Sequence, residues 1–244
     1  MSAKLSILEF MDGNIRKQDV IKTLVETFVH TGQPVGSMQV TEQLPYEVSS
    51  ATIRNDMVEL TELGLLAQPH TSAGRIPTDF GYKTYVKLIT EERRELSKKQ
   101  QEVLSNHFKK LRSLQEKYQA AAKLLAEMSG SIGMLMDDTQ NVYLSGIGNI
   151  AKMPEFNDDQ FGIKLIEALE QPKELMHNAS QTLNPQDVNV LIGGDNPKIN
   201  KATIVITNFG PQGKRVISII GPTRMNYNKA LPLVDYMRKL LNDL

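Results

Sequence analysis

The segment from residue 48 to residue 78 constrains the fold of this chain more than any other part of it. Residues 50–63 repeat apolar side chains at helical spacing behind a polar start, which predicts an amphipathic helix. Gly64 ends that helix, and short apolar runs then alternate with Gly and Pro, as in a β-hairpin. A helix followed at once by a hairpin is the chain order of a winged helix-turn-helix, whose two parts fit the grooves of B-DNA.

Residues 14–90 form the first predicted domain, a mainly helical winged helix-turn-helix. Its first helix is indicated by an apolar stripe made of Val20, Ile21, Leu24, Val25 and Phe28. Gly32 ends this helix, and Ser37 is the expected N-cap of a short second helix over residues 37–44. Thr78 is expected to cap a fourth helix after the hairpin.

The third helix carries short hydrogen-bonding side chains and one guanidinium on its outer face. The predicted base-reading residues are Thr52, Arg54 and Asn55. The predicted phosphate-contacting residues are Ser37, Ser49 and Ser50, and Ser49 or Ser50 is also the expected N-cap. The same residue types occur on many exposed helices for solubility, so this alternative stays open for the helix alone.

Three acidic residues, Asp56, Glu59 and Glu62, follow in the C-terminal half of that helix. Because carboxylates repel phosphates, only the first two turns of the helix are expected to approach DNA.

The hairpin is expected to have strands at residues 65–67 and 75–76 and a wing tip at residues 69–74. Its predicted DNA contacts are His70, Thr71, Ser72 and Arg75. A tip of small residues turns closely against a duplex, and an arginine suits a narrow minor groove or its phosphates. The alternative is an ordinary hairpin tip with a solvated arginine. The adjacency of the helix and the hairpin favours DNA binding.

The charge balance opposes this interpretation. The chain has 28 Lys and Arg against 28 Asp and Glu, and residues 1–90 have 8 basic and 10 acidic side chains. A strongly basic domain would indicate phosphate binding by itself, and this one is not basic. Any DNA affinity must therefore come from the local placement of a few cations and from the doubled contacts of a dimer.

Residues 91–130 predict one long, highly charged helix. Apolar residues repeat every seven positions in two neighbouring columns over about four heptads, which indicates a coiled coil. The predicted dimerisation residues are Leu104, Leu111, Leu114, Tyr118 and Leu125. Such a seam needs a covering surface, supplied either by self-pairing of two copies or by folding back onto the C-terminal domain. We favour self-pairing.

Residues 131–244 alternate strand and helix patterns and predict a small α+β domain. The expected strands are 132–136, 142–144, 188–192, 202–207 and 215–220, and the expected helices are 158–170, 174–182 and 230–241. Residues 208–211 resemble a hairpin connection and favour antiparallel pairing of the strands beside them. The whole chain is therefore predicted to be an α+β multidomain protein.

An enzyme is not expected. The four histidines are scattered without metal-ligand spacing, and we predict no metal and no cofactor. Asp137-Asp138 is interpreted as a turn rather than a catalytic pair, and residues 193–197 as a turn because no P-loop lysine follows. Arg224 is interpreted as the partner of a nearby acid, with a role in binding a ligand or a partner as the alternative.

The chain has no cysteine, which is compatible with a reducing, intracellular compartment. No run of apolar residues is long enough to span a membrane. Residues 1–13 hold charges in their apolar stretch and no cleavage pattern, so no signal peptide is expected. A cytoplasmic protein is predicted.

Four sequence blocks resemble the family of the bacterial heat-inducible transcription repressor HrcA. They are QPVGS at residues 33–37, SSATIRNDM at 49–57, LLAQPHTSAGRIPTDFGY at 65–82 and IIGPTRMNY at 219–227. The blocks are long and keep one order, so the resemblance is specific. It covers residues 14–90 and, more loosely, residues 130–244.

The resemblance implies a dimeric repressor of heat-shock and chaperone genes that binds an inverted-repeat operator. It also implies a nucleoid-associated bacterial protein, help from a GroEL-type chaperonin, and a GAF-like C-terminal domain with an inserted dimerisation domain. Family members are considerably longer. This chain is therefore expected to be a shortened member whose GAF-like domain is truncated, with the heptads taking over dimer formation.

Two other functions remain open from the sequence. In one, the C-terminal domain binds a small metabolite and controls the same DNA-binding head. In the other, suggested by the near-neutral head, the chain has lost DNA binding and acts only through protein partners.

Overall fold

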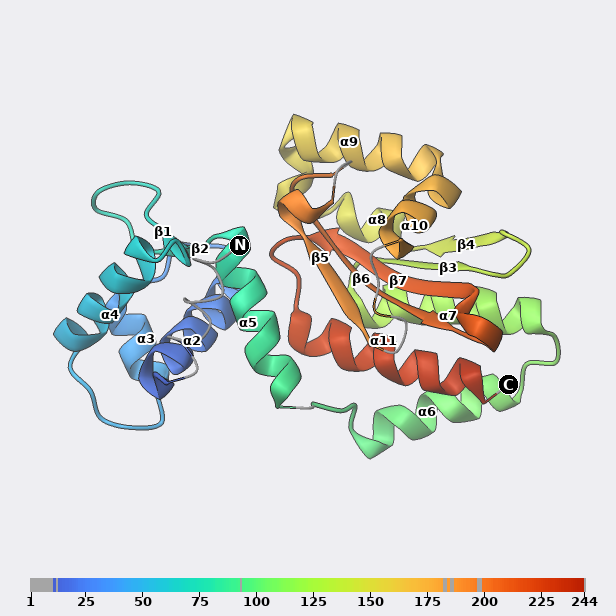
Figure 1. Ribbon diagram of the computed structural model, residues 1–244, viewed down its shortest axis with the longest axis horizontal. Helices are drawn as coiled ribbons and strands as arrows, with labels where there is room; N and C mark the ends of the chain where they lie inside the picture. The colour runs from blue at the N-terminus through green and yellow to red at the C-terminus, as the bar shows by residue number, and fades with distance from the viewer. Residues whose placement is uncertain are drawn as a thin grey trace. The chain divides into compact units, whose positions relative to one another are not determined.

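The computed structural model describes residues 11, 13–92, 94–181, 184, 187–196 and 199–243, without the side chains of residues 159 and 160. It divides into two compact units, Met1–Arg93 (unit 1) and Arg94–Leu244 (unit 2), which are coloured along the chain in Figure 1. The expectation that residues 1–13 contain no signal peptide lies almost wholly outside the described residues. Of the helices that are described, none has the length and apolarity to cross a membrane.

Unit 1 has its elements in the expected order. They are α2 (Ile15–Thr31), α3 (Ser37–Gln43), α4 (Ser50–Glu62), β1 (Leu66–Ala67), β2 (Ile76–Pro77) and α5 (Asp79–Glu91). The helix ends follow local chemistry: Gly32 closes α2 in the left-handed conformation, and the Thr78 hydroxyl accepts from the Gly81 amide at the start of α5. One boundary differs, because Gly36 rather than Ser37 is the N-cap of α3.

The core of unit 1 lies where α2, α3, α4, α5 and the hairpin meet. Its fully buried side chains include Val20, Leu24, Val40, Ile53 and Leu60. These residues are the apolar stripes visible in the sequence, so burial of one face of each helix holds this unit together.

Unit 2 is built on a five-stranded antiparallel sheet with the order β4-β3-β7-β6-β5. Its strands are β3 (Ile132–Met136), β4 (Val142–Ser145), β5 (Asn189–Ile192), β6 (Ala202–Phe209) and β7 (Arg215–Pro222). Its helices are α6 (Lys98–Lys109), α7 (Leu114–Ser129), α8 (Ile147–Ile150), α9 (Asp159–Glu170), α10 (Pro172–Ser180) and α11 (Tyr227–Asn242), with short turns η1 (Pro154–Asn157), η2 (Gly193–Asp195) and η3 (Pro211–Gly213). The α+β class predicted for residues 131–244 is confirmed, and so is the antiparallel β6–β7 hairpin.

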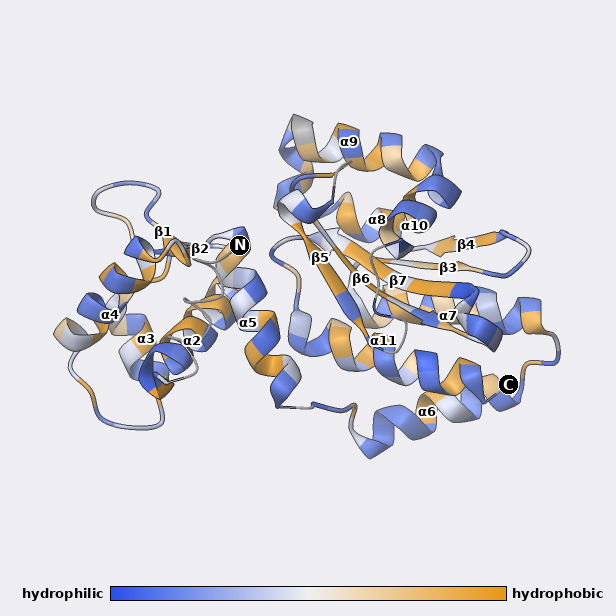
Figure 2. Ribbon diagram, viewed as in Figure 1, coloured by the Kyte–Doolittle hydropathy of each residue, from blue (hydrophilic) through white to orange (hydrophobic). Residues whose placement is uncertain are grey.

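Helices cover both faces of this sheet (Figure 1). Met134, Ile204 and Ile220 face α9 and α10 in one apolar cluster. The other face meets α7 and α11, and there the Thr203 hydroxyl bonds the Tyr227 hydroxyl at 2.9 Å. The central strands are apolar along most of their length (Figure 2), because both of their faces are buried.

The single helix expected over residues 91–130 is wrong. The structure has two helices, α6 and α7, and each begins with a capping box. At the start of α7 the Ser113 hydroxyl accepts from the Glu116 amide at 3.1 Å, and the Glu116 carboxylate accepts from the Ser113 amide at 3.1 Å. These reciprocal bonds satisfy amides that a helix start leaves unpaired, so a new helix begins there.

Three of the five predicted dimerisation residues are covered within the chain itself. Leu104, Tyr118 and Leu125 are 1%, 4% and 0% exposed within a single chain, whereas Leu111 is half-buried and Leu114 is 47% exposed. The Tyr236 hydroxyl of α11 donates to the Gln101 carbonyl of α6 at 2.9 Å. The alternative of folding back onto the C-terminal domain therefore applies, because the sheet and α11 cover the apolar side of α7 and α6 is bonded to α11.

Two further motifs have structural roles. The Arg224 Nε donates to Glu155 Oε1 at 2.5 Å, which confirms the pairing with an acid. Burial has the largest single effect and raises the pKa of Glu155, but the hydrogen bond from Arg224, a backbone hydrogen bond and the charge of Arg224 together lower that pKa below its ordinary value. Residues 193–195 form the short turn η2, as expected for the described part of that segment.

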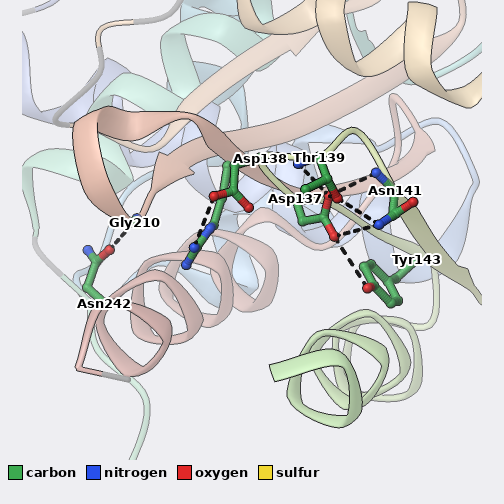
Figure 3. Close-up of polar contacts among 8 residues, drawn as sticks. Asp137, Asp138, Thr139, Asn141, Tyr143, Gly210 and Asn242 are labelled. Atoms are coloured by element: carbon green, nitrogen blue, oxygen red, sulfur yellow. Dashed lines mark hydrogen bonds and ion pairs between the residues drawn. The ribbon is translucent and has the colours of Figure 1, made fainter. Parts of the chain in front are cut away.

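The β3–β4 turn is organised by one buried carboxylate (Figure 3). Asp137 Oδ1 accepts from the amides of Thr139 and Asn141, both at 2.9 Å, and from the Thr139 hydroxyl at 2.7 Å. Burial raises the pKa of Asp137, but these hydrogen bonds together lower it by more than burial raises it. The pKa of Asp137 therefore lies below the ordinary value. The interpretation of Asp137-Asp138 as a turn is confirmed.

Asp137→Ala should lower the free energy of unfolding of unit 2 by about 1–3 kcal/mol, because the turn amides lose a charged acceptor. A depressed carboxyl pKa adds stability above the unfolded-state value near 3.9 and loses it as the pH falls through the folded-state value. Urea unfolding of both proteins from pH 7 to pH 3 should therefore show the difference shrinking below about pH 4. Asp138→Ala is the matched control and should change stability much less, since Asp138 only reaches Arg215 Nη2 at 3.3 Å on the surface. Equal losses from the two variants would contradict this role of Asp137.

Candidate nucleic-acid interface

The starts of α3 and α4 are joined through hydroxyl groups. Ser49 is the N-cap of α4, and its Oγ accepts from the Thr52 amide at 3.0 Å and lies 2.8 Å from the Thr52 hydroxyl. The hydroxyls of Ser37 and Ser50 bond each other at 2.9 Å. Four of the predicted polar residues therefore lie together at the starts of α3 and α4. Each of their hydroxyls can still make a further hydrogen bond.

The outer face of α4 is open. Arg54 and Asn55 are exposed, and neither side chain has a hydrogen bond or ion pair to another described residue. Thr52 is half-buried and already bonded to Ser49, which limits its reach compared with Arg54 and Asn55. The face therefore offers one guanidinium and one amide with their donors and acceptors unused.

Two of the three acidic residues of α4 are paired with the start of α2. Asp56, which is 2% exposed, accepts from Arg16 Nε at 2.6 Å and from Arg16 Nη2 at 3.0 Å. Lys17 Nζ lies 2.7 Å from Glu59 Oε2. The hydrogen bond to Asp56 raises the pKa of Arg16. The repulsion expected from these carboxylates is therefore largely neutralised, and only Glu62 of the three stays exposed without an ion pair among the described residues.

Sequence reasoning missed Arg16 and Lys17. Their partners lie about forty residues further along the chain, at a separation that no local periodicity predicts. The only signal was a basic pair at the start of α2.

The hairpin, called the ribbon below, consists of β1, β2 and residues 68–75 between them. Leu66 pairs with Pro77 and Ala67 with Ile76. The predicted contact residues His70, Thr71 and Ser72 are exposed at its tip. Sequence reasoning missed the side chain that shapes the tip: Gln68 Nε2 donates to the carbonyls of Thr71 at 2.9 Å and Ala73 at 3.1 Å.

Arg75 lies at the base of the ribbon rather than at its tip. Its backbone exchanges two hydrogen bonds with Val35, at 2.9 and 2.8 Å, and its Nε donates to the Thr61 hydroxyl of α4 at 3.0 Å. Arg75 is half-buried and its Nε is bonded, so it differs from the freely projecting cation expected from the sequence. Its two terminal nitrogens have no described partner.

Gly74 makes the crossing of the ribbon base over Val35 possible. A Cβ atom at residue 74 would lie 2.4 Å from the Val35 carbonyl oxygen and 2.5 Å from its carbonyl carbon. Both atoms belong to backbone that is fixed by the paired hydrogen bonds to Arg75. Only glycine fits there without moving the ribbon.

The groups on this surface are suited to recognition through hydrogen bonds and charge. Within the described ranges, no three His, Cys, Asp or Glu side chains are grouped so that they could hold a metal ion. The surface combines hydroxyls, one amide and guanidinium groups around a helix and a ribbon, which are the groups that contact phosphates and base edges.

Comparison with known proteins gives one consistent family. A family model described as the HrcA protein C terminal domain matches residues 74–231. The heat-inducible transcription repressor HrcA of Natranaerobius thermophilus is 27% identical over 330 residues, covering 92% of this chain and 94% of that protein. The repressor of the same name from Gloeobacter violaceus is 39% identical over 132 residues, covering 54% of this chain and 36% of that protein.

One solved structure has the same fold. A protein described as a hypothetical protein, in a crystal structure at 2.2 Å resolution, superposes with a TM-score of 0.77 at 18% identity. The match covers 94% of this chain and 96% of that one.

The alignment with the Natranaerobius protein also confirms that the chain is short. It runs over 330 positions, whereas 92% of a chain of 244 residues supplies about 224 of them, so roughly 100 positions have no counterpart here. These positions lie inside the aligned region.

Gly74→Ala should destabilise unit 1 by about 1–3 kcal/mol, because the added methyl group overlaps fixed backbone. Hydrogen exchange of the full chain should show faster exchange in the ribbon and at Val35, with unit 2 unchanged. Gly36→Ala is the matched control, since a Cβ there would meet only the Gln39 side chain at 3.7 Å. Similar exchange in both variants would show that the crossing tolerates a side chain.

Proposed function

The chain belongs to the HrcA family, and from this premise we propose that it is a heat-inducible transcription repressor that binds double-stranded operator DNA through unit 1. The observation that carries this proposal is the open face of α4, where the side chains of Arg54 and Asn55 have no partner among the described residues and lie near a group of hydroxyls. Side chains without such partners are available to reach base edges.

Unit 1 acts as a winged helix in this proposal. The helix α4 enters the major groove with Arg54 and Asn55 toward base edges, and Thr52 contributes from the first turn. Ser37, Ser49 and Ser50 contact phosphates at the joined helix starts, where helix amides also favour anions. The ribbon lies beside the same groove, with His70, Thr71 and Ser72 at its tip and Arg75 at its base.

The charge of unit 1 favours binding as a dimer. Unit 1 has no excess of basic residues, so one copy neutralises few phosphates. Two copies on an inverted repeat double the contacts without any change in sequence. Because Leu104, Tyr118 and Leu125 are buried inside unit 2, the proposed dimer surface does not include these three residues. A GAF-like identity of unit 2, help from a chaperonin and nucleoid association are parts of the proposal that rest on the family alone.

Footprinting on the chaperone promoters of the chain's own genome tests the function directly. The expected result is a protected inverted repeat whose two half-sites lie on one face of the duplex. Protection should weaken steeply with salt, since the contacts release counterions from the DNA. Absence of any protected site at low salt, with folded protein, would leave the interaction-protein alternative in its place.

Arg54→Ala and Arg75→Ala should have different effects on binding. Loss of a base-reading arginine removes about 1–3 kcal/mol of discrimination, so Arg54→Ala should relax sequence preference at one position of each half-site. Loss of a phosphate-contacting arginine should weaken all sequences about equally and reduce the salt slope by about one unit for each subunit.

Competition binding with single-base operator variants at several salt concentrations measures both effects. Arg112→Ala is the matched control, because it removes one exposed arginine from unit 2. Thermal unfolding of the Arg75 variant shows whether losing the bond to Thr61 destabilises unit 1. If its unfolding temperature is unchanged, weaker binding reports the lost phosphate contact. Identical specificity profiles for the two variants would contradict this division of roles.

A further inference from the structure

An exposed valine lies on the same face of α4 as the two free polar side chains. Residues 51, 54, 55 and 58 share one face of an α-helix because their spacings are three and four residues. Ala51 is exposed, and Val58 is 39% exposed. Single apolar residues on a surface are common, so exposure alone does not assign Val58 a role.

The surroundings of Val58 make the third turn of α4 compatible with a duplex. The acidic residues that flank it in sequence are Asp56 and Glu59, and these carboxylates are paired with Arg16 and Lys17. Without these pairs the two charges would keep phosphates away from this turn. With them, the exposed face from residue 51 to residue 58 carries one cation, one amide and two apolar side chains. Glu62, four residues beyond Val58, is exposed without an ion pair among the described residues, so the approach to phosphates ends before the last turn of α4.

Distance along the helix also fits. Val58 lies four residues beyond Arg54, which is about 6 Å along the helix axis. A major groove about 12 Å wide accepts a helix over several turns, so both residues reach neighbouring base pairs.

The chemistry selects one base. In the major groove only thymine presents an apolar group, its C5-methyl, and that methyl is contacted by apolar side chains. We propose that Val58 determines specificity by packing against the 5-methyl group of a thymine in each operator half-site. This inference rests on the proposed function, because it requires that α4 enters the major groove.

The experiment removes the methyl group and leaves every hydrogen bond in place. Operator DNA is first obtained by selection from random inverted repeats with the full-length chain. Each thymine of one half-site is then replaced in turn by deoxyuridine, and binding is measured for the wild type and for Val58→Ala. At one position the wild type should lose about fourfold in affinity, the value of one buried methyl-sized group, while Val58→Ala should lose less than about 1.5-fold.

The control variant is Val103→Ala, the same substitution at an exposed residue of unit 2. It should keep the full sensitivity to deoxyuridine. Alanine has the higher helix propensity, so Val58→Ala is expected to fold, and thermal unfolding checks this directly.

The outcomes separate the inference from the function beneath it. Failure to select any DNA contradicts the proposed function itself. Selective binding with no thymine sensitive to deoxyuridine overturns the role of Val58 and leaves the function intact. A sensitivity that is unchanged in Val58→Ala does the same, because another side chain would then contact that methyl group.

Discussion

The ion pair between Arg16 and Asp56 fixes the orientation of α4, and the candidate interface depends on it. Asp56 directly follows Asn55 in the sequence, and its side chain is buried. A buried carboxylate without a partner would destabilise the fold. The two hydrogen bonds from Arg16 satisfy it and fix the rotation of α4 against α2. Because Arg16 is partly exposed, solvent screens the pair, and its loss would cost about 1–3 kcal/mol rather than the larger penalty of a fully buried pair. The consequence for the interface is geometric: with Asp56 turned inward, Arg54 and Asn55 face outward.

The rest of unit 1 extends this arrangement with neutral groups. The hydroxyl bonds at the starts of α3 and α4 hold the two helices together, and the paired backbone bonds between Val35 and Arg75 attach the ribbon to the same body. None of these contacts needs an excess of positive charge. Because its charge is balanced, unit 1 is suited to recognition through shape and specific hydrogen bonds. Its attraction to DNA of arbitrary sequence should be weak.

Unit 2 shows how a shortened family member closes its own sheet. Relative to a longer relative, roughly 100 aligned positions are absent, yet both faces of the five-stranded sheet are covered by helices. Part of that cover comes from α7, with α6 held beside α11, so apolar residues that repeat like a coiled-coil seam serve as core. The heptad pattern and the pattern of a helix packed on a sheet differ little over two or three turns, and the partner decides between them.

The sequence by itself determined the element order, the strand and helix positions of residues 131–244, and the polar residues on α4 and the ribbon. These features depend on neighbours within a few positions: apolar periodicity, caps such as Thr78, and the left-handed glycine at residue 32. Local information was also present but missed at Ser113 and Glu116, whose capping box divides the expected long helix in two. Only the tertiary structure decided that Asp56 and Glu59 are paired with α2, that Arg75 lies against Thr61, and that Leu104 and Leu125 are core. Each of these depends on contacts between distant segments, because burial and charge pairing are properties of the folded arrangement and not of neighbours along the chain.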